Sequence, residues 1–533
     1  MNSESINKTL FQWNRRKSWT IINMNPENLT MNLITGDWIP VLFDNRVQKD
    51  VGLKELYEKS REIRDLVLNP AQRISVMRLL ICITQAALDG PENEKDWLEC
   101  ESRIIPESIK YLDERMDLFN LYGGKRFMQF DRLVANEWKV LDKLDFSSPS
   151  ASTLFEHSAS SEFIRERKDA WKAINLITLL NFHTTGKVGQ AILDEVNLNH
   201  PTFPTLCIGH LHTILKGDNL LETICLNLLT KKEVSSLPNG KWGKPIWDYF
   251  PASATDNEAI ENATRTYLGR LLPLSRLIFL DQSQDSTKCI IGPTPKTIEY
   301  EQLPAFREPS TTVLIGKTNN LYYLRISSEK HIWRDLGSVL FLSSSSTSGA
   351  AVTLNKTSII SGASNNKTID VWVGGLELGD QAAKLNDMVE WNLSLPLKLL
   401  GESVLLKYQH GVGKGVEGGI ALKNAVNSYR KTLKIEADLA QKAALKYWQF
   451  LDNKYQILVE TACDDTGTKS LEGDWRKLIY EAMKHAYETT CAHETPRQIQ
   501  AFVTGKRNLH IGKIENAKKQ SLNAVETKGE AAE

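Results

Sequence analysis

The sequence lacks an excess of charge of either sign. Its 533 residues include 65 Lys plus Arg and 65 Asp plus Glu, so the formal net charge at pH 7 is zero. This balance argues against a protein whose whole surface attracts nucleic acid, and it leaves only local basic patches for that purpose. The sequence also lacks a run of 18 uncharged apolar residues and an apolar segment near its N-terminus. We therefore expect a soluble, cytoplasmic protein with no membrane span.

Paired cysteines are missing as well. The seven cysteines include no C-x-x-C pair, which argues against a zinc ribbon and is typical of free thiols in a reducing compartment.

The short motifs that mark common enzyme sites are absent. The sequence contains no G-x-S-x-G, no H-E-x-x-H and no G-x-x-x-x-G-K-[ST]. The glycine-rich run at 411–419 lacks the Lys-Ser/Thr pair of a phosphate loop, so we interpret it as helix packing or a helix break. His210 and His212 are the closest histidines to a metal or catalytic pair. They are two residues apart, which places them on one face only in a strand, and no third ligand lies nearby.

What the sequence does contain is typical of a globular chain. Hydrophobic residues make up 41% and charged residues 24%, which excludes global disorder, and the length is enough for two to four domains. The pattern favours the α+β class, with a large mixed α/β N-terminal domain that carries β-hairpins and a C-terminal helical bundle of four helices. We expect four segments: a flexible N-terminal extension at 1–30, the large domain at 31–400, the bundle at 401–515 and a disordered tail at 516–533.

Local patterns predict individual elements. Apolar residues at helical spacing predict helices at 72–88, 170–180, 219–229, 421–433, 439–458, 475–487 and 497–503. Two β-rich runs around Asn319 and Asn320 predict a hairpin at 311–326. A second hairpin is predicted at 369–392, with its tip near 379–382. The loop 183–190 has two glycines that flank Lys187 and Val188, and glycine lets backbone N–H groups approach a phosphate or a DNA groove closely.

The order of six further segments points to a family. They are MNLITGDWIPV at 31–41, FMQF at 127–130, TLFEHS at 153–158, ILKGDNLLETICLNLL at 214–229, YLGRLLPLSRLIFL at 267–280 and VGGLELGDQAA at 373–383. In this order the chain resembles CasA-type proteins, the large subunits of type I-E CRISPR Cascade, over residues 31–515.

The resemblance implies a non-catalytic subunit without cofactors. Such a subunit recognises a short motif in double-stranded DNA, the PAM, and opens the duplex beside it so that the guide RNA can pair. It also recruits the helicase-nuclease. The implied partners are the guide RNA, target DNA, the other Cascade subunits and the helicase-nuclease, and no membrane.

The same resemblance assigns roles to individual residues. The DNA- and PAM-binding residues that it implies are Gly186, Lys187, Val188 and Gly189 in the glycine loop, Lys296 as a lysine finger and Gln381 as a wedge at a hairpin tip. The residues that it implies for docking and for the guide RNA handle are Leu154, Phe155 and His157. Relatives have a denser run of glycines in the loop, so Lys187 and Val188 bear on the PAM preference. Some relatives carry a four-cysteine zinc site before the lysine finger, whereas this region holds only Cys289, so we predict no metal.

Two alternatives stay open on the sequence. One is a standalone hydrolase or transferase that uses the region of His210 and His212. The other is a structural scaffold of a related RNA-guided complex that does not read a PAM.

Overall fold

The computed structural model describes residues 31–145, 168–281, 287–343, 345–356, 368–379 and 385–511, and the backbone of two short paired strands, β1 (Leu10–Trp13) and β2 (Trp19–Ile22). Contacts between Cα atoms divide the chain into two compact units. Unit 1 consists of Met1–Thr311, Leu324–Ile326 and Trp372–Glu390, and unit 2 of Thr312–Tyr323, Ser327–Val371 and Trp391–Glu533. The domain boundaries predicted from the sequence stay predictions.

Helix α2 (Pro70–Leu88) lies in the core of unit 1. It begins with a capping box, in which Asn69 and Gln72 satisfy each other's backbone N–H groups, and with a proline in its first turn. It contacts four of the other helices of the unit, α4, α5, α6 and α9. The helices of unit 1 besides α2 are α1 (Leu53–Glu58), α3 (Glu94–Glu99), α4 (Glu101–Asp113), α5 (Asp169–Asn181), α6 (Leu220–Asn227), α7 (Lys231–Ser236), α8 (Asn257–Arg265) and α9 (Tyr267–Leu271).

The strands of unit 1 form small sheets rather than one large sheet. One has the order β4-β3-β5, from β3 (Ile39–Phe43), β4 (Gln48–Val51) and β5 (Ile63–Leu66). A second has the order β10-β11-β6, from β6 (Lys139–Val140), β10 (Leu277–Leu280) and β11 (Lys288–Gly292). The short strands β7 (Ala191–Leu193) and β8 (Val196–Leu198) pair as a hairpin.

Two long strands, β14 (Thr368–Leu378) and β15 (Leu385–Pro396), form a three-stranded sheet with β9 (Leu211–Lys216), in the order β15-β14-β9. The predicted hairpin at 369–392 is thereby confirmed. The residues from Trp372 to Glu390 belong to unit 1.

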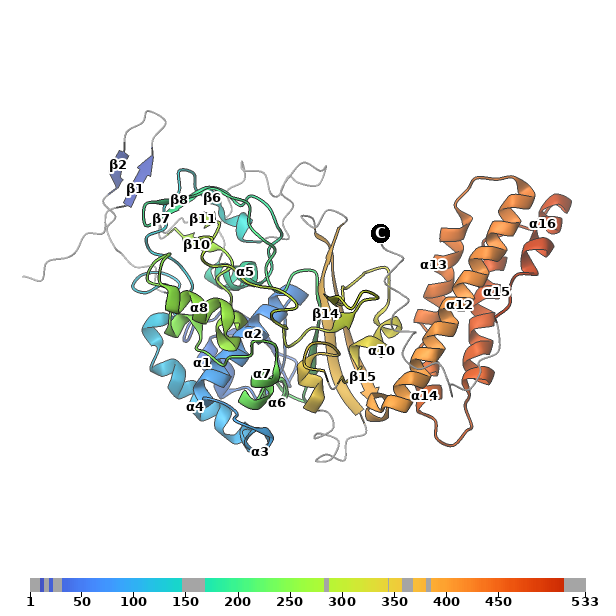
Figure 1. Cartoon of the computed structure of the whole chain (residues 1–533), viewed down its shortest axis with the longest axis horizontal. Helices are drawn as coiled ribbons and strands as arrows, with labels where there is room; N and C mark the ends of the chain where they lie inside the picture. Colours follow the sequence, from blue (N-terminus) through green and yellow to red (C-terminus); the bar gives the residue numbers. More distant parts are fainter. Residues whose placement is uncertain are drawn as a thin grey trace, which may run out of the picture. The chain divides into compact units, whose positions relative to one another are not determined.

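Unit 2 contains most of the hairpin predicted at 311–326, and it contains the C-terminal helices that Figure 1 shows. Strands β12 (Val313–Ile315) and β13 (Leu321–Tyr323) pair antiparallel around Asn319, as the sequence predicts. The helices of the unit are α10 (Leu336–Val339), α12 (Glu402–Leu433), α13 (Leu439–Asp452), α14 (Gln456–Cys463), α15 (Arg476–Glu488) and α16 (Pro496–Lys506). The α+β fold class with C-terminal helices is confirmed.

The glycine-rich run at 411–419 lies inside α12 and is a packing surface, in agreement with the first of its two interpretations. A Cβ on Gly411 would come within 2.3 Å of Leu458, and one on Gly418 within 2.5 Å of Tyr447. The bare backbone also accepts hydrogen bonds from the neighbouring helices, because Trp475 Nε1 donates to the carbonyl of Gly411 at 2.8 Å. Glycine thus lets helices approach α12 closely.

The single helix predicted at 439–458 is wrong at one point. Helix α13 ends at Asp452 and α14 begins at Gln456. The carboxylate of Asp452 accepts a hydrogen bond of 2.6 Å from Trp333 Nε1, and Asn453 follows it. Asp and Asn compete with the helix for hydrogen bonds, so a break there costs little and the apolar spacing continues across it.

No helix among the described residues is long and apolar enough to cross a membrane.

Candidate nucleic-acid interface

The glycine loop, Gly186–Gly189, follows α5 and is held by a short backbone bridge. The amide of Gly186 donates to the carbonyl of Thr202 at 3.2 Å, and the amide of Thr202 donates to the carbonyl of Gly186 at 2.8 Å. Gly186 has φ of 129° and Gly189 of 130°, a region that residues with a Cβ rarely adopt. The shape of the loop therefore requires both glycines.

The two residues between the glycines lie in different environments. Lys187 is exposed, whereas Val188 is only 7% exposed and packs into the protein. A Cβ built on Gly186 would meet no atom within 4 Å, so the backbone there is open to a ligand. The loop consequently presents bare backbone and one cation to solvent, while Val188 contributes packing.

A buried arginine fixes the base of the glycine loop. Arg276 is 2% exposed, and its Nη2 donates to the carbonyl oxygens of Thr184 at 3.0 Å and Phe203 at 2.9 Å. These carbonyls belong to the two segments that the Gly186–Thr202 bridge joins. Burial lowers the pKa of Arg276 to about 9, so the guanidinium keeps its charge at neutral pH. One cation therefore clamps both sides of the loop.

His183 completes this base as a neutral imidazole. Its Nδ1 lies 2.7 Å from the carbonyl oxygen of Thr184, which can only accept, so Nδ1 carries the proton, and Nδ1 also lies 3.1 Å from Nη2 of the Arg276 cation. Burial and the charge of Arg276 lower the pKa of His183 to about 3. A proton on this ring would place two cations side by side in a buried position.

Lys139 of β6 lies against the other end of the loop. Its Nζ would be 2.6 Å from a Cβ placed on Gly189, so any side chain at this position would displace the ammonium group. Burial lowers the pKa of Lys139. Gly189 thus brings the loop backbone into contact with a cation, an arrangement that suits an anionic ligand.

Lys296 lies on the segment that leaves β11. It is exposed, and its neighbour Thr297 anchors the segment through a hydrogen bond of 2.9 Å to the carbonyl of Ala254. Strand β11 passes the glycine loop, because a Cβ on Gly292 would lie 2.4 Å from that of Ala191, two residues beyond Gly189. Lys296 is four residue steps from Gly292, a span of at most about 14 Å. The structure therefore brings the glycine loop and Lys296 to one region of unit 1.

Strand β14 is held closely against the chain around β9. A Cβ on Gly375 would lie 2.3 Å from the carbonyl oxygen of His210, so only glycine allows this approach. Farther along the strand, Leu378 packs on Gly209, whose added Cβ would lie 2.8 Å from Leu378 Cδ1. The described part of the hairpin ends at Gly379 and resumes at Leu385.

Four of the predicted site residues lie outside the described residues. They are Leu154, Phe155, His157 and Gln381. Their roles stay predictions.

The two histidines of the enzyme alternative differ in burial, because His212 of β9 is fully buried and His210, directly before the strand, is half-buried. Burial lowers the pKa of His210 to about 3 and that of His212 to about 4. His212 Nε2 lies 2.9 Å from the carbonyl of Cys207, to which it donates, and Nδ1 lies 2.9 Å from Ser310 Oγ. Within the described ranges, no group of three or more His, Cys, Asp or Glu residues is placed to hold a metal ion. His212 is therefore a structural residue of β9, with both ring nitrogens in hydrogen-bond contacts.

Phe203 is a residue that the sequence reasoning missed. It is 74% exposed, and it directly follows Thr202 of the glycine-loop bridge. Its backbone is held by Arg276, and prolines stand at 201 and 204. A fixed backbone with an exposed ring is suited to contact a flat partner. The signal in the sequence was the Pro-Thr-Phe-Pro segment, in which two prolines restrict the chain around an aromatic residue.

The model of the CRISPR-associated protein Cse1 family matches residues 32–486 of the chain. This chain belongs to the CRISPR-associated protein Cse1 family. The match includes the glycine loop, Lys296 and the hairpin, and it confirms the family predicted from the sequence.

Relatives of known structure share the fold of this Cse1 family member. A curated CasA/Cse1 protein of Thermus thermophilus is 27% identical over 331 residues, which span 58% of this chain and 60% of that protein. The crystal structure of Thermobifida fusca Cse1 has a TM-score of 0.73 at 19% identity, with 90% of this chain and 98% of that chain covered. A chain of a CRISPR RNA-guided surveillance complex has a TM-score of 0.67 at 15% identity, with 90% and 99% covered.

Proposed function

We propose that this chain is the non-catalytic large subunit of a CRISPR RNA-guided surveillance complex and that it reads a PAM in double-stranded DNA. Family membership and the shared fold with a chain of such a complex support the assembly. The guide RNA, the other subunits and the target DNA are then its partners.

The observation that carries the PAM-reading role is the geometry of the glycine loop. The DNA minor groove is about 6 Å wide, so a backbone without side chains fits it better than a helix does. The loop has an open backbone at Gly186 and an exposed Lys187, and Lys139 adds a cation at its other end. Lys296 supplies a further contact from the neighbouring segment. Readout in the minor groove separates A·T from G·C pairs only, which predicts a relaxed PAM.

Phe203 extends this interface. Its exposed ring lies on the segment that pairs with the glycine loop, and we assign it an apolar contact with a deoxyribose or base edge of the bound duplex.

The hairpin β14–β15 carries the second step, the opening of the duplex beside the PAM. Gln381 at its tip inserts into the first base step, which costs about a few kcal/mol of unstacking and is offset by hydrogen bonds to the separated bases. Leu154, Phe155 and His157 dock the subunit onto the guide RNA handle and adjoining subunits, and the assembled complex recruits the helicase-nuclease.

The test replaces Lys296 by Ala in the assembled complex and measures affinity for duplexes that differ only in the PAM. A base contact predicts a loss of about 1–3 kcal/mol that depends on the PAM. Lys49→Ala, at an exposed lysine paired with Glu55, is the matched control and should leave affinity unchanged.

A loss by the same factor on every PAM would reduce Lys296 to a phosphate contact. A complex whose affinity does not depend on the PAM at all, with or without the substitution, would favour the scaffold alternative.

A further inference from the structure

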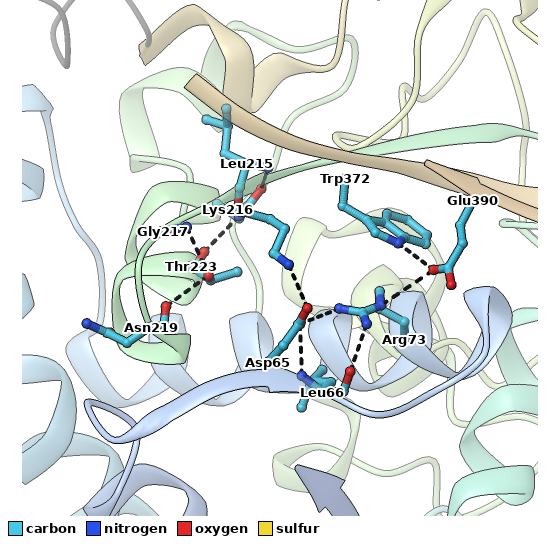
Figure 2. A network of polar contacts seen from close by, with 11 residues as sticks. Asp65, Leu66, Arg73, Leu215, Lys216, Gly217, Asn219, Thr223, Trp372 and Glu390 are labelled. Carbon is cyan, nitrogen blue, oxygen red and sulfur yellow. Dashed lines mark hydrogen bonds and ion pairs between the residues drawn. The ribbon is translucent and has the colours of Figure 1, made fainter. Parts of the chain in front are cut away.

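The root of the hairpin is joined to the core of unit 1 by a network of charged and aromatic side chains, which Figure 2 shows. Its members come from five elements. They are Asp65 of β5, Arg73 of α2, Lys216 of β9, Trp372 of β14 and Glu390 of β15.

The core side of the network is an ion pair between one carboxylate and two cations. Asp65 Oδ1 accepts from Arg73 Nη1 at 2.5 Å, and Asp65 Oδ2 accepts from Lys216 Nζ at 2.6 Å. Burial alone would raise the pKa of Asp65, but Arg73 and Lys216 outweigh it and the pKa is lowered. Arg73 Nη2 also donates to the carbonyl of Leu66 at 2.7 Å. The guanidinium of Arg73 is therefore fixed in position on the central helix.

The hairpin side consists of one residue from each of its strands. Trp372 is fully buried, and its Nε1 donates to Glu390 Oε2 at 2.6 Å. The guanidinium of Arg73 lies 5.7 Å from the centre of the Trp372 ring, within the range of a cation–π contact. Glu390 is thus oriented by Trp372 and faces Arg73.

The contact between Arg73 and Glu390 is longer than a hydrogen bond. Arg73 Nε and Glu390 Oε2 are 3.9 Å apart, and Nε is buried with no hydrogen-bond partner among the described residues. A hydrogen bond needs about 2.9 Å, so Arg73 and Glu390 interact through charge and not through a hydrogen bond. On this side the network therefore links the hairpin root to α2 through a charge pair and the cation–π contact.

A small rotation at the root displaces the far end of the hairpin, because the strands between them are long. Gln381 lies nine residues after Trp372 and nine residues before Glu390. The six residue steps from Trp372 to Leu378 span about 20 Å, so a rotation of about 5° at the root moves the strand end by about 2 Å. One base step in DNA rises only about 3.4 Å. Small changes at the network are therefore large on the scale of a base step.

We propose that Arg73, Trp372 and Glu390 are positioning residues that set the direction of the hairpin during duplex opening. This inference rests on the proposed function of the hairpin as the wedge. The three residues touch no DNA. They act through the orientation of the strands that carry Gln381.

The main experiment uses Glu390→Gln in the assembled complex. Glutamine still accepts the hydrogen bond of Trp372 but loses the charge that faces Arg73. R-loop formation should slow about tenfold on a closed linear duplex, since an ångström of misplacement can cost up to ~10²-fold. On a duplex already opened beside the PAM, the rate should be within about twofold of the unchanged complex, because the wedge is then not needed. The matched control, Glu55→Gln, removes a carboxylate from an exposed pair of 2.8 Å with Lys49 and should change neither rate.

A second measurement follows the hairpin directly. Spin labels at Ala382→Cys and Glu94→Cys report the distance from the hairpin tip to helix α3 of unit 1. The native cysteines are buried, apart from the half-buried Cys463. Glu390→Gln should broaden or shift this distance distribution. An unchanged distribution would overturn the positioning role even if the variant were less stable.

Gln381→Ala, measured in parallel, separates the two proposals. If Gln381→Ala slows opening of the closed duplex and Glu390→Gln does not, the positioning role is wrong and the wedge role stands. If neither slows it, both are wrong. If only Glu390→Gln slows it, the direction of the hairpin matters and Gln381 is not the wedge residue. Equal slowing by Glu390→Gln on closed and opened duplexes would indicate a folding defect and overturn the positioning role.

Discussion

The glycine loop and the root of the hairpin are held in two different ways. The loop depends on a backbone bridge and on one buried cation, Arg276, which donates to carbonyl oxygens. The hairpin root depends on charged pairs that are partly open to solvent, since the side chains of Asp65 and Glu390 are 23% and 39% exposed. Salt screens exposed charges much more than buried ones. The loop proposed to read DNA and the hairpin proposed to open the duplex are thus held by different kinds of interaction.

The largest expected effect is at the base of the glycine loop. Arg276→Gln should lower the free energy of unfolding by about 3 kcal/mol, because the buried carbonyls of Thr184 and Phe203 lose their donor. Lys216→Gln at the hairpin root should cost only about 1 kcal/mol, because its partner Asp65 keeps Arg73 and some solvent. Urea denaturation of both variants measures the difference. Equal costs would contradict the contrast between the two regions.

As the pH falls, the base of the glycine loop should lose stability before the hairpin network does. His183 has a pKa near 3 in the folded chain against an ordinary value of 6.5, so below pH 6.5 the unfolded chain binds more protons and stability falls. At pH 5 this costs about 2 kcal/mol for His183, and His210 and His212 add to the loss. The pKa of Asp65 is lowered from 3.8, so the hairpin network keeps its stabilising charge until the pH falls below that value.

Thermal melting from pH 7 to pH 4.5 checks this order. The melting temperature should fall, and His183→Asn should reduce its pH dependence. The same slope in the variant would mean that His183 is already accessible to protons in the folded chain.

The smallest expected effect distinguishes the two glycines of the loop. Gly189→Ala should cost about 2 kcal/mol, because it adds backbone strain and displaces Lys139. Gly186→Ala should cost about 1 kcal/mol, from strain alone, because its Cβ would meet open space. Both values follow from denaturation, whereas affinity for duplex DNA should fall more for Gly186→Ala, because the proposed DNA contact lies at the open backbone of Gly186. A larger loss of affinity for Gly189→Ala would contradict a DNA contact at Gly186 and would indicate that the substitutions act only through the shape of the loop.

Much of the fold could be predicted from the sequence because it depends on local patterns. Apolar spacing marked α2, and β-branched and aromatic runs around a turn marked both hairpins. The prediction of one helix at 439–458 was wrong, because the helix ends at Asp452 although the apolar spacing continues in the sequence. Asp452 accepts a tertiary hydrogen bond from Trp333, which the sequence pattern does not contain.

The candidate site was predictable only in part. The glycines of the loop carry a conformational signal, and Lys296 followed from the family resemblance. His183, Arg276 and Lys139 carried no signal, because each acts through residues far away in the chain, and Phe203 carried only that of its two flanking prolines. Arg276, for example, lies 92 residues from Thr184 and 73 from Phe203.

By itself the sequence determined the family, the fold class and the residues with unusual backbone freedom, because order of segments, periodicity and glycine content are properties of the chain. Only the tertiary structure decided which charges meet and which histidines are buried. Those outcomes depend on desolvation and on distances across many residues, as in the network that joins Asp65 to Lys216 and Arg73 to Glu390. The order of residues in the sequence shows neither the desolvation of a side chain nor its distance from residues far away in the chain.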